Sequence, residues 1–136
     1  MITKGDLQSY YWTRQNVQKL EDKLLELETE ATRITTRMSH TPKGSGNNDK
    51  ISGIVAEIVD VQDKINSKLK QSYIIMAQIE QAASRLPERE AYLIRRRYID
   101  CLTWEQIAVD MHYSWQHVHK IHAKALKLLA STCDRD

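Results

Sequence analysis

Apolar side chains recur at alternating spacings of three and four residues early in the sequence, and no other feature constrains the fold as strongly. The positions are Val17, Leu20, Leu24, Leu27, Ala31, Ile34 and Met38. This is the a/d heptad pattern, which gives a helix one continuous apolar seam for packing against another helix. The sequence has only four Gly, two Pro and no Phe, a composition that favours helices over a turn-rich sheet protein. We therefore expect one long helix over residues 6–38 and an all-α fold.

A second stripe of the same kind predicts a second long helix over about residues 50–84. Its apolar positions are Ile51, Ile54, Ile58, Val61 and Ile65 and then, after a shift of one residue, Leu69, Tyr73, Met76, Ile79 and Ala83. We interpret the shift as a stutter, which locally relaxes supercoiling. Residues 39–49 are rich in Gly, Asn and Ser and should form a loop. Residues 1–85 are thus expected to form a long antiparallel, coiled-coil-like hairpin. It could serve as a scaffold or an oligomerisation arm, and a homodimer and docking onto another protein both stay open.

Positive charge gathers in the last third of the chain, although the net charge of the whole chain is only +2. Residues 111–133 contain three Lys and four His and no carboxylate, and Arg89, Arg95, Arg96 and Arg97 precede them. Such local clustering is typical of a nucleic-acid-binding surface. The two cysteines, Cys101 and Cys133, make no disulfide framework, and no apolar run is long enough to cross a bilayer. We expect a protein of the reducing cytoplasm with no membrane partner.

The segment after Leu86-Pro87 carries the pattern of a helix-turn-helix, and we expect residues 86–136 to form a separate DNA-binding domain. Thr103-Trp104-Glu105-Gln106 fits a capping box that starts one helix, His112 and Tyr113 form the turn, and Ser114 caps the next helix. The core positions expected from the spacing are Ile107, Ala108, Met111, Tyr113, Val118 and Ile121, continued by Ala125 and Leu128. An ordinary helical hairpin within an all-helical core is the open alternative.

Residues 86–129 resemble region 4 of bacterial sigma factors. The resemblance rests on LPERE, the RRRY end of the first helix, TWEQIA, the Ser cap, Val-x-x-Ile and AKAL. The whole chain also resembles small phage and prophage proteins of Gram-positive bacteria that pair an N-terminal helical region with such a C-terminus, and among which are late transcription regulators of the autolysin-regulator type. The turn departs from the usual pattern, because His112 stands where a Gly commonly adopts positive φ. Since His is enriched among the non-Gly residues that adopt this conformation, the motif should persist with some strain.

The resemblance implies which side chains meet DNA. Trp115, Gln116 and Lys120 would occupy the base-reading positions, and Arg89, Arg97, Lys124, His117 and His119 would lie near phosphates. Gln116 suits adenine N6 and N7, and Lys120 suits guanine O6 or N7. Independently of the resemblance, the helix that starts after Thr103 offers the first N–H groups of its N-terminus, beside Trp104, to a phosphate. Arg95 and Arg96 are interpreted as solvated charges.

The histidines near the C-terminus have a second interpretation as a metal cluster. His119 and His122 share a helix face, but His117 does not, and no Cys or carboxylate lies beside them at zinc-site spacing. We therefore expect neither a metal nor another cofactor. Beside phosphates the pKa values of these three histidines should rise, so that DNA affinity strengthens as the pH falls.

No catalytic motif is present in the sequence: it has no Gly-rich phosphate loop, no nucleophile elbow and no zinc-protease helix. We expect a sequence-specific regulator of transcription, not an enzyme. The resemblance implies that it acts at promoters with host RNA polymerase, as an activator or as one part of a split sigma factor. The chain is too short to carry also the module that melts the −10 region. Two alternatives stay open: a DNA-packaging protein like a small terminase subunit, and an interaction protein that occupies RNA polymerase.

Overall fold

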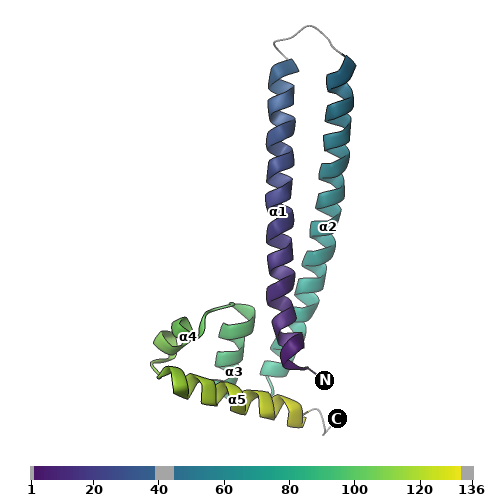
Figure 1. Ribbon diagram of the computed structural model, residues 1–136. Coiled ribbons are helices and arrows are strands. Elements are labelled where there is room, and N and C mark those ends of the chain that lie inside the picture. The colour runs from purple at the N-terminus through teal and green to yellow at the C-terminus, as the bar shows by residue number, and fades with distance from the viewer. Residues whose placement is uncertain (1, 39–44, 133–136) are drawn as a thin grey trace. The chain divides into compact units, whose positions relative to one another are not determined.

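A computed structural model describes residues 2–38 and 45–132 (Figure 1). Within these ranges the chain is helical and contains no strand. The elements are α1 (Lys4–Met38), α2 (Ser45–Ala83), α3 (Glu88–Ile94), the π-helix η1 (Arg95–Ile99), α4 (Trp104–Met111) and α5 (Trp115–Thr132). The all-α prediction is confirmed.

The contacts divide the chain into two compact units. One unit comprises Arg14–Lys70, and the other comprises Met1–Thr13 together with Gln71–Asp136. The first turns of α1 and the last turns of α2 are therefore grouped with the C-terminal helices. Whether residues 86–136 form an independent domain, as the sequence predicts, stays a prediction.

The unit of residues 14–70 is an antiparallel pair formed by α1 and α2. Its buried seam consists of Val17 and Leu27 from α1 and Val61 and Ile65 from α2. Five partly buried residues pack against this seam: Leu20, Leu24, Ile54, Ile58 and Leu69. All nine lie on the stripes that predicted the two helices, which confirms the hairpin and its apolar seam.

Helix α2 begins earlier than expected. It starts at Ser45 and not near Lys50, so residues 45–49 of the predicted loop are helical. The other predicted loop residues, 39–44, lie outside the described part of the chain. Ser, Asn and Asp are common in turns but also favoured at helix N-termini, so the composition of this segment suited either structure.

The buried side of α2 keeps a seven-residue spacing, and the predicted stutter is wrong. Ile65, Ser72 and Ile79 lie seven residues apart and are all buried, whereas Tyr73 is 59% exposed. The prediction selected Tyr73 because it is the more apolar neighbour. The continuous heptad instead places Ser72 on the buried side of the helix.

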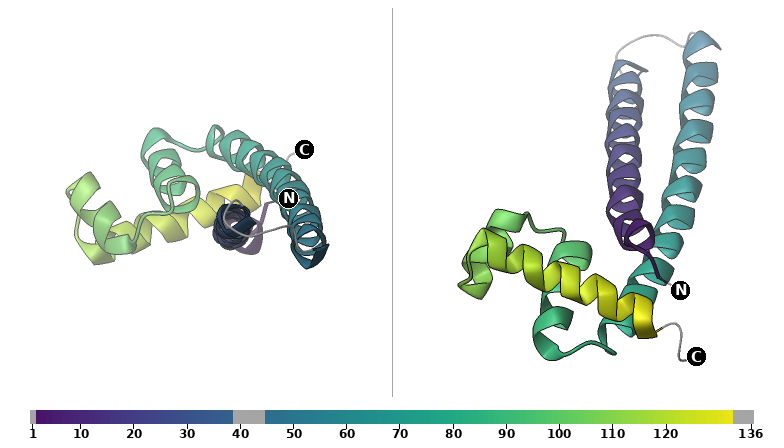
Figure 2. Two further views of the ribbon diagram at one scale, coloured as in Figure 1. Left: turned by 90° about the horizontal axis from the view of Figure 1, so that it is seen from above. Right: turned by 60° about the horizontal axis from the view of Figure 1, so that its bottom comes forward.

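The other unit is built around α5, which packs against both α3 and α4 (Figure 2). Its core joins Leu7 from α1, Ile79 from α2, and Leu93 and Ile94 from α3 to side chains of α4 and α5. Leu7, Leu93 and Ile94 are fully buried. The start of α1 thus completes the core that supports the C-terminal helices, a role that its sequence alone did not indicate.

The segment that links α3 to α4 includes a π-helical turn. Pro87 is the N-cap of α3, and α3 passes directly into η1, where the N–H of Asp100 donates to the carbonyl oxygen of Arg95. Cys101 follows with a φ of 58°. This turn and the left-handed residue set the direction in which the chain enters α4, and neither was predicted.

None of the helices in the described ranges is both long enough and apolar enough to span a bilayer.

Candidate nucleic-acid interface

The helices α4 and α5 each begin with the capping interaction that the sequence predicts. The side chain of Thr103 accepts from the N–H of Gln106 at 3.2 Å, and the side chain of Gln106 accepts from the N–H of Thr103 at 2.9 Å. This reciprocal pair is the expected capping box. At the start of α5, the hydroxyl of Ser114 accepts from the N–H of His117 at 3.1 Å. Both helix starts are thereby fixed by side chains that belong to the motif.

The turn between α4 and α5 depends on His112. Its φ is 58° and its ψ is 39°, which is the left-handed conformation predicted for this position. The N–H of Tyr113 donates to the carbonyl oxygen of Ala108 at 3.1 Å, which closes the end of α4. A residue with a Cβ pays a conformational cost there, so this turn is less favourable than one with Gly.

Most of the residues predicted for the helix-turn-helix core lie in the core of this unit. Ile107, Val118, Ile121 and Ala125 are buried, and Ala108 and Met111 pack against them at partial exposure. Two positions differ from the prediction. Leu129 is buried at the end of α5 where Leu128 was expected, although Leu128 also packs on the core. Tyr113 does not fill the turn: it is 38% exposed, and its ring contacts that of His117 at 4.5 Å between centroids.

The three predicted base-reading side chains are exposed. Trp115, Gln116 and Lys120 lie in the first two turns of α5, and Trp115 is 53% exposed. They alternate with Val118 and Ile121, which point into the core, so the first turns of α5 present one buried and one free side. Base contacts by these residues stay a prediction, and their exposure meets its first requirement.

His119 does not share this free side. Its ring lies between Trp115 and Trp104, with centroid distances of 4.0 Å and 4.5 Å. Its Nε2 atom is buried and has no hydrogen-bond partner in the described part of the chain. This geometry closes Nε2 to a phosphate, so the predicted phosphate contact of His119, which stays a prediction, would be made through Nδ1. The ring instead supports Trp115 from behind.

The indole of Trp104 also packs inward. Besides His119 it contacts the ring of His122 at 4.7 Å, and the guanidinium of Arg97 lies over it at 4.5 Å. Its side chain is therefore committed to the interior of the unit. If Trp104 meets a phosphate, it does so through its backbone N–H in the first turn of α4.

His122 is buried, and its environment contradicts the predicted rise in its pKa. Its Nε2 atom lies 2.5 Å from the hydroxyl of Tyr98, also buried. Burial, reinforced by the positive charge of Lys4 and by His119 and Arg97, lowers the pKa of His122 from 6.5 to about 4. Burial likewise raises the pKa of Tyr98 to about 12, although the charge of Arg97 opposes this rise. At neutral pH both groups are uncharged, and the Tyr98 hydroxyl can donate to His122.

Two of the predicted phosphate contacts, Arg89 and Lys124, converge on one carboxylate. Glu90 is buried, and its Oε1 lies 3.0 Å from Nη2 of Arg89 and 3.6 Å from Nζ of Lys124. Burial alone would raise the pKa of Glu90. The hydrogen bond from Arg89, a backbone hydrogen bond and the two positive charges hold that pKa below its ordinary value. Glu90 thus holds two cations together at exposed positions on α3 and α5.

Arg97 and Thr103 lie at the junction of η1 and α4. Nη1 of Arg97 donates to the carbonyl oxygen of Leu102 at 2.8 Å, which fixes the guanidinium beside the entry to α4. Thr103 is exposed at the N-terminus of that helix. Both remain candidates for phosphate contacts, and His117 is likewise exposed on α5.

Arg95 and Arg96, which the sequence suggested to be solvated charges, form ion pairs. Arg95 pairs with Glu80 at 3.1 Å, and Arg96 lies 3.4 Å from Asp110 and 3.3 Å from Asp100. These partly exposed pairs link η1 to α2 and α4. Exposed pairs of this kind add at most about 1 kcal/mol each to stability.

The described residues contain no group of three or more His, Cys, Asp or Glu side chains placed to hold a metal ion.

Comparison with known proteins identifies the unit that these residues build. Residues 82–130, from the end of α2 into α5, match the model of the family described as Sigma-70, region 4. No curated protein and no solved structure matches the chain. The chain therefore carries a sigma-70 region 4 domain, a DNA-binding helix-turn-helix of the regulatory type, over the residues of its candidate interface.

Proposed function

We propose that the protein is a sequence-specific transcription regulator that binds duplex DNA and inserts the first turns of α5 into the major groove. The carrying observation is that the sigma-70 region 4 match coincides with a capped helix-turn-helix whose second helix exposes Trp115, Gln116 and Lys120. In such units the N-terminal residues of the second helix contact base edges. Gln116 would read adenine and Lys120 guanine, while Trp115 would pack on a thymine methyl or a sugar.

The phosphate contacts would surround this helix. Arg89 and Lys124, held together by Glu90, would meet the backbone through the donors that Glu90 leaves unused. Arg97, Thr103 and the first N–H groups of α4 would meet it at the other helix, and His117 at the start of α5. Such contacts fix the register of the protein on the duplex, whereas the three base-reading residues give specificity.

The further context of this activity is also a proposal. The resemblances of the sequence support a phage- or prophage-encoded regulator that acts at promoters with host RNA polymerase, in the cytoplasm of a bacterial cell. A DNA-packaging protein and a protein that only occupies RNA polymerase are the rivals. The hairpin would serve as a scaffold, as an arm that joins two copies, or as a surface for another protein.

Retention of genomic DNA tests the proposal. The purified protein is mixed with sheared DNA from its source genome, and the retained fragments are sequenced. A regulator retains one or a few sites beside promoters, whereas a packaging protein retains packaging-region DNA and has a ring-sized mass in solution. Retention of no specific DNA, with or without RNA polymerase, contradicts the proposal.

Paired variants link the retained site to α5. Lys120→Ala and Gln116→Ala should each weaken specific binding by about 1–3 kcal/mol, because each removes one base contact. Lys19→Ala is the matched control for Lys120→Ala, since it removes the same charge from an exposed position on the hairpin. Gln62→Ala, also exposed on the hairpin, is the control for Gln116→Ala. Equal loss in the variants and their controls contradicts the assignment of α5.

A further inference from the structure

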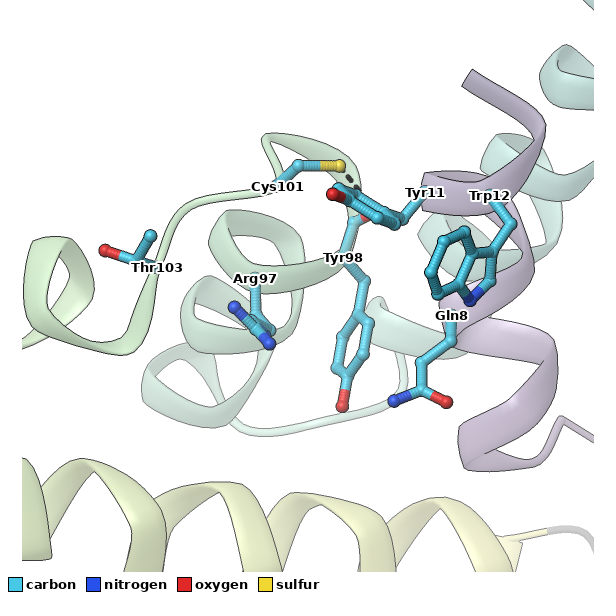
Figure 3. Close-up of a pocket in the computed structure, with 7 residues that line it drawn as sticks. All are labelled: Gln8, Tyr11, Trp12, Arg97, Tyr98, Cys101 and Thr103. Carbon is cyan, nitrogen blue, oxygen red and sulfur yellow. Dashed lines mark hydrogen bonds between the residues drawn. The ribbon is translucent and has the colours of Figure 1, made fainter. Parts of the chain in front are cut away.

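A pocket of about 410 Å³ lies between the first turns of α1 and the junction of η1 with α4, all within one compact unit (Figure 3). Gln8, Tyr11 and Trp12 line it from α1, and Arg97 and Thr103 line it from the opposite side. The α1 residues lie outside the stretch that matches sigma-70 region 4, which begins at residue 82. Nothing in that family match therefore assigns them a role.

The charge of the lining favours an anion. Of the seven side chains that line the pocket, Arg97 carries a positive charge and none is a carboxylate. The guanidinium is held in place by the Leu102 carbonyl oxygen at 2.8 Å and by the Trp104 ring at 4.5 Å. These contacts fix the guanidinium and leave some of its N–H groups without a hydrogen-bond partner among the described residues, which preorganises it for a phosphate.

The α1 side of the pocket offers neutral donors and apolar ring faces. Tyr11 and Trp12 are 42% and 63% exposed, and their rings meet edge to face with centroids 5.2 Å apart. The phenol hydroxyl, the indole N–H and the amide of Gln8 are groups that donate to phosphate oxygens. The ring faces suit the apolar surface of a deoxyribose. A sugar–phosphate strand presents both of these surfaces in alternation.

The pocket is continuous with the proposed DNA surface. Thr103 lines its rim and is also the N-cap of α4, where a backbone phosphate is expected in a helix-turn-helix. The Thr103 oxygen accepts from Gln106, which leaves the hydroxyl proton for a ligand on the outer side. A strand that meets Thr103 and Arg97 thus has the α1 side chains next along its path.

We propose that Gln8, Tyr11 and Trp12 of α1, with Arg97 and Thr103, form a second contact for the DNA backbone that extends the bound duplex beyond the helix-turn-helix site. The proposal rests on the proposed function and adds to it the site on α1. The start of α1 then has two roles: Leu7 completes the core of the unit, and the residues that follow it contact flanking DNA.

Binding to duplexes of two lengths tests the inference with the full chain. Both duplexes carry the retained genomic site, and one also carries flanking base pairs on each side. We expect the protein to bind the longer duplex more tightly. Tyr11→Ala/Trp12→Ala should lower the affinity for the longer duplex alone by about tenfold or more, because the loss of even one hydrogen bond to a charged group costs about tenfold. Tyr73→Ala is the control, because Tyr73 is an exposed aromatic residue elsewhere in the same unit, at 59% against 42% for Tyr11 and 63% for Trp12. The inference is overturned if the wild-type protein binds the two duplexes equally tightly, or if the double variant binds the longer duplex as tightly as the wild-type protein does.

Salt dependence separates the charged member of the site from the neutral ones. Arg97→Gln should lower the slope of log K against log salt by about one, because one phosphate contact is lost. The double variant should leave that slope unchanged. A slope that Arg97→Gln does not alter overturns the phosphate assignment.

Cys101 supplies a readout inside the pocket. It lines the pocket and is partly exposed, and Cys133→Ser leaves it as the only thiol in the chain. The longer duplex should slow alkylation of Cys101 severalfold, and the shorter one should not. Specific binding without this protection overturns the inference while leaving the proposed function intact, whereas absence of binding to either duplex contradicts both. If RNA polymerase protects Cys101 and DNA does not, the pocket receives a protein, and the DNA proposal for it is wrong.

Discussion

Acidification from pH 7 to pH 5 should destabilise the DNA-binding unit through His122. This side chain is buried beneath Trp104, and its pKa is lowered from 6.5 to about 4. The unfolded chain therefore takes up a proton as the pH falls below 6.5, while the folded chain keeps a neutral imidazole until about pH 4. The stabilisation by neutral His122 is complete above pH 6.5 and is lost as the pH falls between these two values.

The size of the effect follows from the two pKa values. Each unit of difference corresponds to about 1.4 kcal/mol, so the free energy of unfolding should fall by about 2 kcal/mol between pH 7 and pH 5 and by about 3 kcal/mol at pH 4. The interval between pH 7 and pH 5 isolates the effect of His122 better than the interval below pH 5. The carboxylates of Glu90 and Asp6, whose pKa values are both lowered, stay ionised there and add little to the slope.

Urea unfolding followed by circular dichroism at pH 7, 6 and 5 measures this dependence. His122→Gln is the informative comparison, because an amide does not titrate and its oxygen can still accept from the Tyr98 hydroxyl. We expect the variant to lose about 2 kcal/mol less than the wild-type protein over this range. Parallel pH profiles for the two proteins would refute the assignment of a neutral, buried His122.

Three further predictions concern other parts of the same unit. Leu7→Ala should lower the free energy of unfolding by about 2–5 kcal/mol, because it empties a fully buried position in the core; a change below 1 kcal/mol in urea unfolding would show that α1 is not part of that core. Thr103→Ala should cost about 1 kcal/mol through loss of the capping box, while Thr103→Ser, which keeps the hydroxyl, should cost less in the same assay. His119→Ala should weaken discrimination at the base pair that Trp115 reads, because it removes the ring whose centroid lies 4.0 Å from that of the indole. His119→Phe keeps an aromatic ring there and should retain the discrimination. Equal base preferences of the wild-type protein and both variants, in selections from random duplexes, would contradict this prediction.

The long helices and the helix-turn-helix could be predicted because their signals are local. Apolar spacing identified the buried seam of α1 and α2, and the Thr103–Gln106 box, the His112 turn and the Ser114 cap depend on residues within a few positions of one another. Exposure of Gln116 and Lys120 also follows from their position relative to Val118 on one helix. These features need no knowledge of the tertiary fold.

The errors arose where side chains from different elements meet. His119 and Trp104 look like polar or amphipathic surface residues in sequence, but each finds aromatic partners on another helix. Glu90 lies in the first turn of α3, and only the packing of α3 on α5 shows that it holds Arg89 and Lys124.

Predicted and observed burial also differ where residue type and helix register disagree. Tyr73 is more apolar than Ser72, yet the continuous heptad buries Ser72. Leu7 precedes the regular stripe of α1, so spacing gave no reason to place it in the core that supports α4 and α5. Register decides burial at Ser72, and the packing partners from α2 to α5 decide it at Leu7.

The most direct test of sequence-specific DNA recognition by α5 is fluorescence anisotropy with two duplexes of the same length, the retained genomic site and a scrambled sequence. The affinities of the wild-type protein, Lys120→Ala and Lys19→Ala for both duplexes are measured at two salt concentrations. We predict that the wild-type protein and Lys19→Ala prefer the genomic site by the same factor at both salt concentrations, and that Lys120→Ala loses about tenfold or more of this preference. Equal affinity of the wild-type protein for the genomic and scrambled duplexes, or an unchanged preference in Lys120→Ala, would contradict sequence-specific DNA recognition by α5.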